Sequence, residues 1–360
     1  MVLSAVGAAI HGWWAWRFDG WNATSSVGLG SSQTSCSVVV CLHNEAERVA
    51  GLVEGLTPAL NALEQAGWTV SALAVNHGST DATAVALAAA TSKDPRWKMM
   101  DVAQTRASKK EALVAGVEAS DGDVVVVTDA DCRPLDPDWL VQMTAGAGSA
   151  WDVHVGLSLP AQRTTLLHRL QRLEARRVAQ KAAGAVMAGR PYLGFGRNMA
   201  FTRDIWDRVG GMTGHEHLPS GDDDLWLQAA VKRGARVSVN VNRNAQTHSE
   251  WPSTWAAWRR QKSRHFSASK AYPSALHARL GLPAVGWLLL AAGVVHNPSG
   301  TSVAFAALAF ILRTLTFGMF LHRAGQPRRE AWELVLEPLV SAFRTWAWWK
   351  GQTSESTSWK

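Results

Sequence analysis

The chain has 360 residues, of which 47% are hydrophobic and 18% are charged, and its formal net charge is +7. This length exceeds that of a usual single domain, so we expect one large α/β domain with appended segments. The positive charge is compatible with nucleic acid, but six Lys or Arg residues lie between Trp258 and Arg279, directly before an apolar run. Basic residues in that position favour an anionic lipid surface, so we expect a membrane partner and no nucleic acid.

Neither the cysteines nor the N-terminus indicates secretion. Cys36, Cys41 and Cys132 have the spacing of neither a zinc site nor a disulfide framework, and we expect them to be buried in a reducing compartment. The segment 1–18 has no early basic region, so it matches a signal peptide poorly. It is also short for a membrane span, and its tryptophans suit a membrane interface: Trp13, Trp14, Trp16 and, just beyond it, Trp21.

After a linker rich in Gly, Ser and Thr at 19–35, strand and helix patterns alternate along the chain. We expect strands at Ser37–Val40, Val70–Asn76, Trp97–Val102 and Asp123–Thr128, and helices from Glu45 with an interruption at Pro58, at Asp81–Ala90 and at Ser108–Ala119. Ser108 and Glu111 fit a capping box at the start of the last helix. This alternation predicts parallel β-α-β units, which bind ligands beyond the carboxyl ends of their strands.

The second half of the chain is less regular. We expect a helix at Leu166–Ala188, a glycine-rich loop at Gly194–Gly196, a helix from Asp222 that stops at Gly234, and a strand at Arg236–Val241.

Two apolar runs near the C-terminus, Leu280–Val295 and Thr301–Leu321, predict a helical hairpin in a membrane, although the first is short and Arg313 interrupts the second. A buried hairpin in a soluble domain is the alternative. The connecting loop, 296–302, has no Lys or Arg, whereas both outer flanks do. By the positive-inside rule we expect an inner (cytoplasmic) membrane protein whose catalytic domain faces the cytoplasm.

A third segment, Ala331–Trp349, carries charges and a proline, and we expect it to be interfacial or a poor span. The expected organisation is therefore an N-terminal segment and linker at 1–35, an α/β domain at 36–270, a membrane hairpin at 271–325, and an interfacial segment with a tail at 326–360.

Two groups of carboxylates stand out as chemistry-bearing residues. Asp129 and Asp131 follow a run of valines, at the end of a strand, where carboxylates could hold Mg²⁺ or Mn²⁺ against the phosphates of a nucleotide sugar. The run Asp222, Asp223 and Asp224 opens a helix. Helix capping explains one such acid, but three exceed what a cap requires, and one of them could act as a general base.

The order of motifs resembles family 2 of the inverting glycosyltransferases, which have the GT-A fold. The elements that carry this resemblance span about 36–266: Val39 to Glu45, Asn76 to Asp81, Lys109 with Ala112 and Leu113, Asp129-Ala130-Asp131, Gly196 to Phe201, Gly221-Asp222-Asp223, and Gln261 with Arg264.

The resemblance implies a role for each matching residue. His43, Asn44, Glu45, Asn76, His77, Lys109 and Asp129 would border the nucleotide, Asp131 would bind the metal with Asp129, and Asp223 would be the catalytic base with Asp222 as the alternative. Gln261 and Arg264 would lie near the diphosphate and the acceptor, where Arg264 could stabilise the leaving group. The loop Gly194–Phe201 would line the acceptor site.

Two positions depart from the family pattern. Relatives usually have Asp-Asp-Gly-Ser where this chain has Asn76-His77-Gly78-Ser79, so the donor nucleotide stays open. His77 could stack on the base or simply fill a turn. Relatives also end the later motif in Trp where this chain has His265, which favours transfer of single sugars over chain building.

Several alternatives remain at this point. His248 occupies a position where some GT-A enzymes have a metal ligand, although a structural histidine is the simpler interpretation. We expect a glycosyltransferase that uses a nucleotide-diphosphate sugar and a lipid-linked or cell-envelope glycan acceptor. The alternatives are a non-catalytic sugar-nucleotide-binding member of the same fold and a nucleotidyltransferase, whose glycine-rich triphosphate loop has no counterpart at His43–Glu47.

Overall fold

The computed structural model describes residues 1–18, 34–103, 109–161, 163–216, 218 and 220–353. The predicted linker, the N-cap at Ser108, the last residues of the C-terminal tail and the side chains of the four N-terminal tryptophans lie outside the described residues.

The main sheet has seven strands in the order β3-β2-β1-β4-β8-β6-β9. They are β1 (Ser35–Leu42), β2 (Thr69–His77), β3 (Trp97–Val102), β4 (Val124–Asp129), β6 (Val153–Gly156), β8 (Asn198–Thr202) and β9 (Val237–Asn240). The first four are parallel to one another, as predicted, and β8 runs antiparallel to both β4 and β6. The carboxyl ends of β1, β2 and β4 therefore meet at one edge of the sheet.

Helices cover both faces of this sheet because successive side chains of each strand point to opposite faces. Val38 and Val40 of β1 pack towards α2 (Ala46–Gln65), α3 (Thr83–Thr91) and α5 (Trp139–Thr144). Val39 and Cys41 pack on the other face, towards α4 (Lys109–Glu118), α7 (Arg203–Val209) and α8 (Asp224–Lys232). All three cysteines are buried and none forms a disulfide.

Helix α2 corrects the prediction at Pro58, because it continues through this proline without a break. Its buried residues lie on both sides of Pro58, from Val49 to Leu63. Packing of this face into the core outweighs the hydrogen bond that the proline ring removes.

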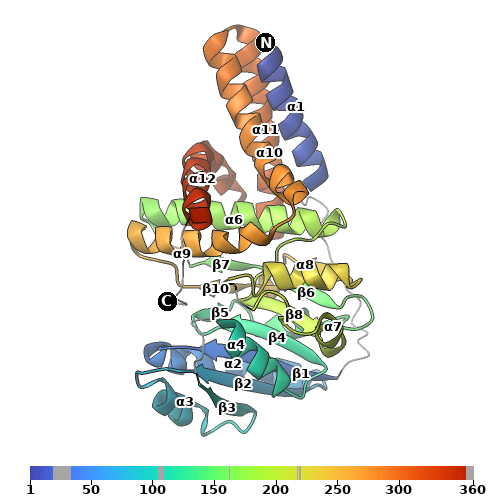
Figure 1. Ribbon diagram of the computed structural model, residues 1–360, viewed down its shortest axis with the longest axis vertical. Coiled ribbons are helices and arrows are strands. Elements are labelled where there is room, and N and C mark those ends of the chain that lie inside the picture. Colours follow the sequence, from blue (N-terminus) through green and yellow to red (C-terminus); the bar gives the residue numbers. More distant parts are fainter. Residues whose placement is uncertain (19–33, 104–108, 162, 217, 219, 354–360) are drawn as a thin grey trace.

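A second layer separates the sheet from the apolar helices (Figure 1). It contains the long helix α6 (Leu166–Met187), the helix α9 (Trp255–Ser267) and a three-stranded sheet in the order β5-β10-β7. These short strands are β5 (Cys132–Pro134), β7 (Ser158–Pro160) and β10 (Thr247–Ser249). Because β5 begins directly after Asp131, this small sheet adjoins the carboxylate pair.

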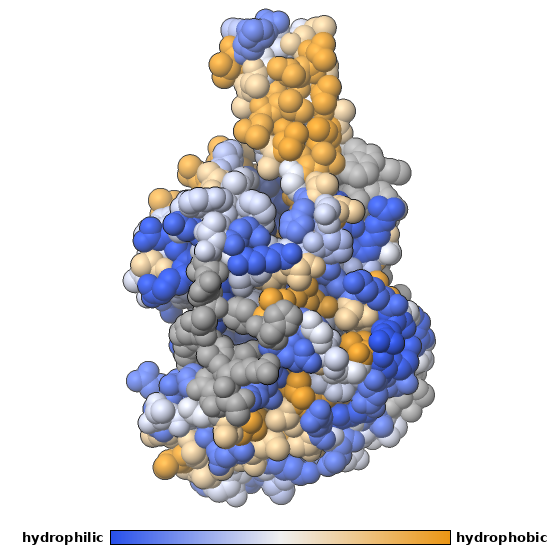
Figure 2. All heavy atoms as spheres, in the orientation of Figure 1, coloured by the Kyte–Doolittle hydropathy of each residue, from blue (hydrophilic) through white to orange (hydrophobic). Residues whose placement is uncertain are grey.

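The C-terminal hairpin consists of α10 (Ser274–His296) and α11 (Gly300–Arg323), and both helices are long and apolar enough to cross a membrane. They project from one end of the molecule (Figure 1), and hydrophobic residues cover most of the visible surface of the projection below its hydrophilic tip (Figure 2). Arg313, which interrupts the second apolar run, is buried, and its Nη2 lies 2.5 Å from both carboxylate oxygens of Glu337.

The N-terminal segment forms α1 (Val2–Phe18), which packs along α10 and α11, a contact that the sequence did not indicate. Small residues permit the close contact. A Cβ at Gly7 would lie 2.7 Å from the carbonyl oxygen of Gly286, and a Cβ at Gly293 would lie 2.7 Å from the backbone nitrogen of Ser4. The projecting part is therefore a three-helix unit made of α1, α10 and α11.

The predicted interfacial segment forms the 3₁₀ stretch η3 (Arg328–Leu336) and the helix α12 (Glu337–Thr353), which packs on α9 and α6. Its surface nevertheless exposes large apolar side chains, namely Trp332, Val335, Leu339, Trp346, Trp348 and Trp349. Exposed tryptophans beside apolar helices fit the interfacial region of a bilayer.

The close contact of α1 with α10 yields the first prediction. We expect Gly293→Leu to destabilise the protein by about 1–3 kcal/mol, because the added side chain has no space beside Ser4. Thermal unfolding in detergent measures the effect. Gly281→Leu on the same helix is the matched control, since an added Cβ there meets nothing within 4 Å. Equal melting temperatures for the two variants would contradict this packing of α1.

Candidate active site

The carboxylate pair lies at the carboxyl end of β4, as predicted. Asp129 is the last residue of that strand, and Asp131 precedes β5. Burial and the neighbouring charge of Asp129 raise the pKa of Asp131, while Arg197 and Arg48 oppose this shift. A buried carboxylate whose ionisation is made more costly by a neighbouring carboxylate is a favourable place for a cation.

The second group of acids lies at the start of α8. Gly221 takes a φ of +97°, a conformation that suits glycine, and the turn it forms directs the next residues into the site. Asp223 is the N-cap of α8: its Oδ1 accepts a hydrogen bond of 2.8 Å from the backbone nitrogen of Asp224. Its Oδ2 accepts a bond of 3.1 Å from the backbone nitrogen of Gly196. The glycine-rich loop and α8 therefore hold this carboxylate from both sides.

The three consecutive aspartates have different acidities. Burial, together with the charges of Asp222 and Asp224, raises the pKa of Asp223 to about 7. Burial also disfavours the charged form of Asp222, but Lys109, Lys110 and Arg264 outweigh it and lower the pKa of that residue. Environments that separate the pKa values of neighbouring acids are typical of sites for acid–base chemistry.

Lys109 brings the two carboxylate groups together. Its Nζ forms an ion pair with Oδ1 of Asp129, lies 3.6 Å from Oδ2 of Asp222, and donates a hydrogen bond of 3.4 Å to the carbonyl oxygen of Gly196. The ends of β4 and α8 and the glycine-rich loop thus converge on one ammonium group.

Helix α9 supplies further positive charge. Gln261 and Arg264 are one turn apart, so they share a face of the helix. Arg264 interacts electrostatically with Asp222 and Asp129. The Oε1 atom of Gln261 is buried and has no hydrogen-bond partner within the described residues, so it is available to a ligand.

Several residues of this site were missed by the sequence analysis. Arg197 interacts with Asp129, Asp131 and Asp223, and its position directly after Gly196 was the available signal. The hydroxyl of Tyr272 donates a hydrogen bond to Asp224, and no local pattern indicated this contact.

The carboxyl ends of β1 and β2, which were predicted to border the nucleotide, lie side by side. Nδ1 of His43 is 2.7 Å from the carbonyl oxygen of His77. The backbone nitrogen of Asn44 donates to Oγ of Ser79 at 3.0 Å, and its Oδ1 accepts a bond of 2.8 Å from the backbone nitrogen of Thr80. Next to them, Oε2 of Glu45 lies 2.5 Å from Nη1 of Arg48.

The side chains of Asn76 and His77, the pair that departs from the family pattern, are buried and contact acidic residues of the protein. Nδ2 of Asn76 donates to Oδ1 of Asp101 at 2.7 Å, and Nε2 of His77 lies 2.8 Å from Oε2 of Glu111. His77 is 0% exposed, so its ring is not available to stack on a nucleobase. Glu111, the predicted capping partner of Ser108, contacts His77 through its Oε2 atom.

His248 is not brought to the carboxylate pair. Its neighbour in β10, Ser249, accepts a hydrogen bond of 3.1 Å from Nη1 of Arg197 and therefore faces the site. Alternation along the strand turns His248 to the other face, where burial and the cations Arg133 and Arg243 lower its pKa. The described residues contain no group of three or more His, Cys, Asp or Glu side chains placed to hold a metal ion.

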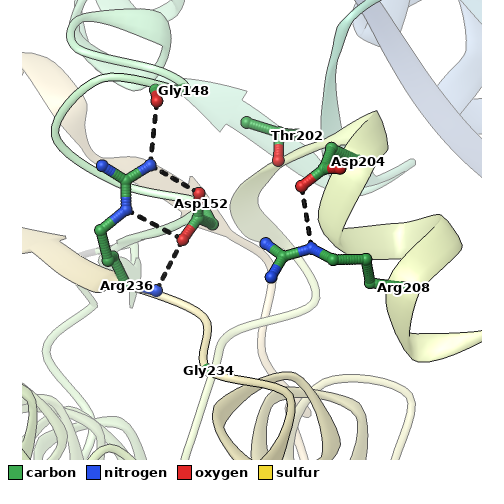
Figure 3. A pocket seen from close by; sticks show the side chains of 7 residues that line it. All are labelled: Gly148, Asp152, Thr202, Asp204, Arg208, Gly234 and Arg236. Atoms are coloured by element: carbon green, nitrogen blue, oxygen red, sulfur yellow. Dashed lines mark hydrogen bonds and ion pairs between the residues drawn. The ribbon is translucent and has the colours of Figure 1, made fainter.

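A hollow of about 560 Å³ lies elsewhere, lined by Gly148, Asp152, Thr202, Asp204, Arg208, Gly234 and Arg236 (Figure 3). Thr202 pairs with Val124 at the start of β4, so this hollow and Asp129 are at opposite ends of that strand. Its charges are paired with each other: Arg236 binds Asp152 at 2.7 Å, and Nε of Arg208 lies 2.9 Å from Asp204. This hollow is therefore a poor candidate for the donor site.

Comparisons with known proteins agree with the fold. A mannosyltransferase from Pyrobaculum calidifontis, solved in complex with GDP-Man and Mn²⁺, superposes with a TM-score of 0.57 at 21% identity, covering 90% of this chain and 96% of that one. Glucosyl-3-phosphoglycerate synthase from Mycobacterium tuberculosis is more distant, with a TM-score of 0.42 at 17% identity, covering 68% of this chain and 82% of its own. The predicted GT-A fold is confirmed.

A curated relative is similar over a shorter region. Undecaprenyl-phosphate 4-deoxy-4-formamido-L-arabinose transferase from Pectobacterium carotovorum subsp. carotovorum (strain PC1) is 29% identical over 153 residues, which are 42% of this chain and 45% of that protein. The match thus spans less than half of the relative. The profile described as "Glycosyltransferase like family 2" matches residues 35–268, most of the chain and all of the elements that build the site. The chain therefore belongs to glycosyltransferase family 2.

Proposed function

We propose that this chain is a membrane-associated, inverting glycosyltransferase that moves a sugar from a nucleotide-diphosphate sugar to a lipid-linked or cell-envelope glycan acceptor. The observation that carries the proposal is the position of Asp223. Its carboxylate is fixed between α8 and Gly196, beside the cluster of Lys109, Asp129 and Asp222, and its pKa is close to neutral.

A divalent cation fits the carboxylate pair. Asp129 and Asp131 would hold Mg²⁺ or Mn²⁺ together with phosphate oxygens of the donor, since such sites often use only one or two carboxylates with substrate phosphates. The raised pKa of Asp131 supports this role, because a bound cation would remove the unfavourable charge. When bound, the cation would neutralise charge on the diphosphate. The Mn²⁺ in the Pyrobaculum mannosyltransferase structure is consistent with this assignment.

In the proposed reaction, Asp223 accepts the proton of an acceptor hydroxyl as its oxygen attacks the anomeric carbon. The bond between that carbon and the diphosphate oxygen breaks, and the nucleoside diphosphate leaves. Lys109, Arg197 and Arg264 are the cations placed to stabilise the charge that develops on the leaving group. A single displacement of this kind inverts the anomeric centre.

The acceptor side of the site adjoins the membrane helices. The hydroxyl of Tyr272 donates to Asp224, and α10 begins at Ser274. An apolar cluster of Ala185, Tyr192 and Leu276, with Leu193, Tyr272 and Leu280 packed against it, connects this region with the start of α10. Apolar side chains beside the site suit a lipid-linked acceptor, and the Pectobacterium relative, by its name, acts on undecaprenyl phosphate.

We further propose an inner-membrane location with the GT-A domain in the cytoplasm. The tip of the hairpin, 297–299, carries no Lys or Arg, whereas Arg323, Arg328 and Arg329 lie at its base. The exposed tryptophans of η3 and α12 would then lie at the cytoplasmic interface.

Removing the base should abolish turnover. We expect Asp223→Asn to lower kcat by about 10²–10⁴-fold, because the amide cannot accept the hydroxyl proton. Release of nucleoside diphosphate by purified protein, measured with a panel of UDP- and GDP-sugars, tests this. Unchanged activity in Asp223→Asn would contradict the assignment. Donor binding by the wild-type chain without turnover on any acceptor would favour the non-catalytic alternative.

The pH profile should follow the carboxyl of Asp223. Because this group acts as a base only when deprotonated, kcat/KM should fall about tenfold per pH unit below an apparent pKa of about 7. Asp224→Asn removes one of the charges that raise this pKa, so the acidic limb should move to lower pH. A limb that stays in place, or moves to higher pH, would show that another group controls it.

Stimulation of turnover by a divalent cation should require the carboxylate of Asp131. We expect chelation by EDTA to stop turnover, Mn²⁺ or Mg²⁺ to restore it in the wild type, and Asp131→Ala to resist restoration at the same metal concentration. Asp204→Ala is the matched control, because this exposed acid lies in the hollow of Figure 3 and should leave turnover unchanged. Metal-stimulated turnover that survives Asp131→Ala would overturn the assignment.

A further inference from the structure

A layer of buried ion pairs joins α6 to the C-terminal elements. Arg169, Arg172 and Arg176 of α6 pair with Glu330 and Glu333 of η3, while Arg177 and Arg313 pair with Glu337. Glu174 binds Lys262 of α9 at 2.5 Å and Arg344 of α12 at 2.7 Å. These contacts lie on the side of the GT-A domain from which the apolar hairpin projects (Figure 1).

Positive charge exceeds negative charge in this layer. The described cations in these pairs outnumber the four carboxylates, and Lys181 adds another. Lys181 lies one helical turn after Arg177, on the same face of α6, and Arg344 and Arg313 are within electrostatic range of it. Concentrated buried charge of one sign is unfavourable unless a counter-charge is present.

Several hydrogen-bond donors of this layer have no acceptor within the described residues, among them Nε of Arg176. Two further ones belong to Lys181 and Arg177, one helical turn apart on α6. The ammonium of Lys181 makes no hydrogen bond or ion pair with them. The Nη2 atom of Arg177 is buried and also has no partner, although Nε of the same side chain donates to Glu337 at 3.2 Å. Burial lowers the pKa of Lys181 to about 7, helped by Arg177 and Arg344 and opposed by Glu337. Bringing an anion to the two donors would restore the charged lysine.

The surroundings identify the kind of anion. The ring of Phe317 lies 5.4 Å from the guanidinium of Arg177, and the indole nitrogen of Trp287 donates to Glu337 at 3.3 Å. Both aromatic residues belong to the apolar hairpin, so the charged layer lies directly at its base. Lys181 and Arg344 are partly exposed, which leaves this region open to a ligand from the lipid phase. In a bilayer spanned by the hairpin, lipid phosphate groups would lie near the ends of its helices.

We infer that Lys181 and Arg177, with Arg344 beside them, bind the phosphate of a membrane lipid at the base of the three-helix unit. Phosphate oxygens would accept hydrogen bonds from the partly exposed ammonium of Lys181 and neutralise the excess charge around the buried guanidinium of Arg177. The ligand is either an anionic phospholipid or the phosphate of a lipid-linked acceptor. This inference rests on the membrane association in the proposed function, but it does not depend on the catalytic role of Asp223.

Thermal unfolding in neutral detergent micelles tests the inference. Phosphatidylglycerol should raise the Tm of the wild-type protein by about 5 °C relative to phosphatidylcholine, because a ligand that binds only the folded state stabilises it. Lys181→Met keeps the apolar stem and removes the charge, and it should lose most of this shift. Lys98→Met is the matched control, since Lys98 is an exposed residue of β3 whose loss changes the net charge equally.

The thermal shifts distinguish a phospholipid site, an acceptor site and the absence of a lipid site. A shift with phosphatidylglycerol that Lys181→Met loses supports a phospholipid site. A Lys181-dependent shift with polyprenyl phosphate, but not with phosphatidylglycerol or inorganic phosphate, supports the acceptor as the source. No shift with any lipid phosphate, a shift with inorganic phosphate alone, or equal shifts in Lys181→Met and Lys98→Met would overturn the inference. Each variant is also assayed for release of nucleoside diphosphate, so failure of the lipid site is distinguishable from failure of the proposed catalysis.

Discussion

The active site depends on one ammonium group. Lys109 pairs with Asp129 from β4 and lies 3.6 Å from Asp222 at the start of α8, and it also contacts the glycine-rich loop through Gly196. Without this cation, the carboxylates of the two elements would repel one another at short range. With it, Asp222 stays ionised, and Asp223 is left as the member of the group with a nearly neutral pKa.

The same architecture links the candidate site to the apolar hairpin. Asp224 follows the candidate base and binds Tyr272, which lies two residues before α10. The pair of Arg313 and Glu337 fastens the hairpin to the elements that cover α6. Removing one partner of such a buried pair is expected to cost about 3–5 kcal/mol, because the other charge remains buried. The position of the hairpin relative to the site is therefore set by buried polar contacts as well as by apolar packing.

Sequence patterns predicted the parts of the molecule that are governed by local rules. The valine-rich strand before Asp129, the helix at Asp224 and the hairpin each have a strong local signature, and β3 was predicted with its observed bounds. Parts governed by tertiary packing were missed. These include the short strands β5, β6, β7, β8 and β10, the passage of α2 through Pro58, and the docking of α1 on the hairpin. His248 points away from the carboxylate pair because of the pairing register of β10, which cannot be read from the sequence.

The configuration of the product tests the central claim most directly. If Asp223 assists a single displacement, the newly formed glycosidic bond must have the opposite anomeric configuration to the bond in the donor sugar. We predict that NMR of the product formed from the donor that this protein uses will show inversion, and that Asp223→Asn will form no such product. Retention of configuration would contradict the account, because a single displacement assisted by Asp223 as a base always inverts the anomeric centre.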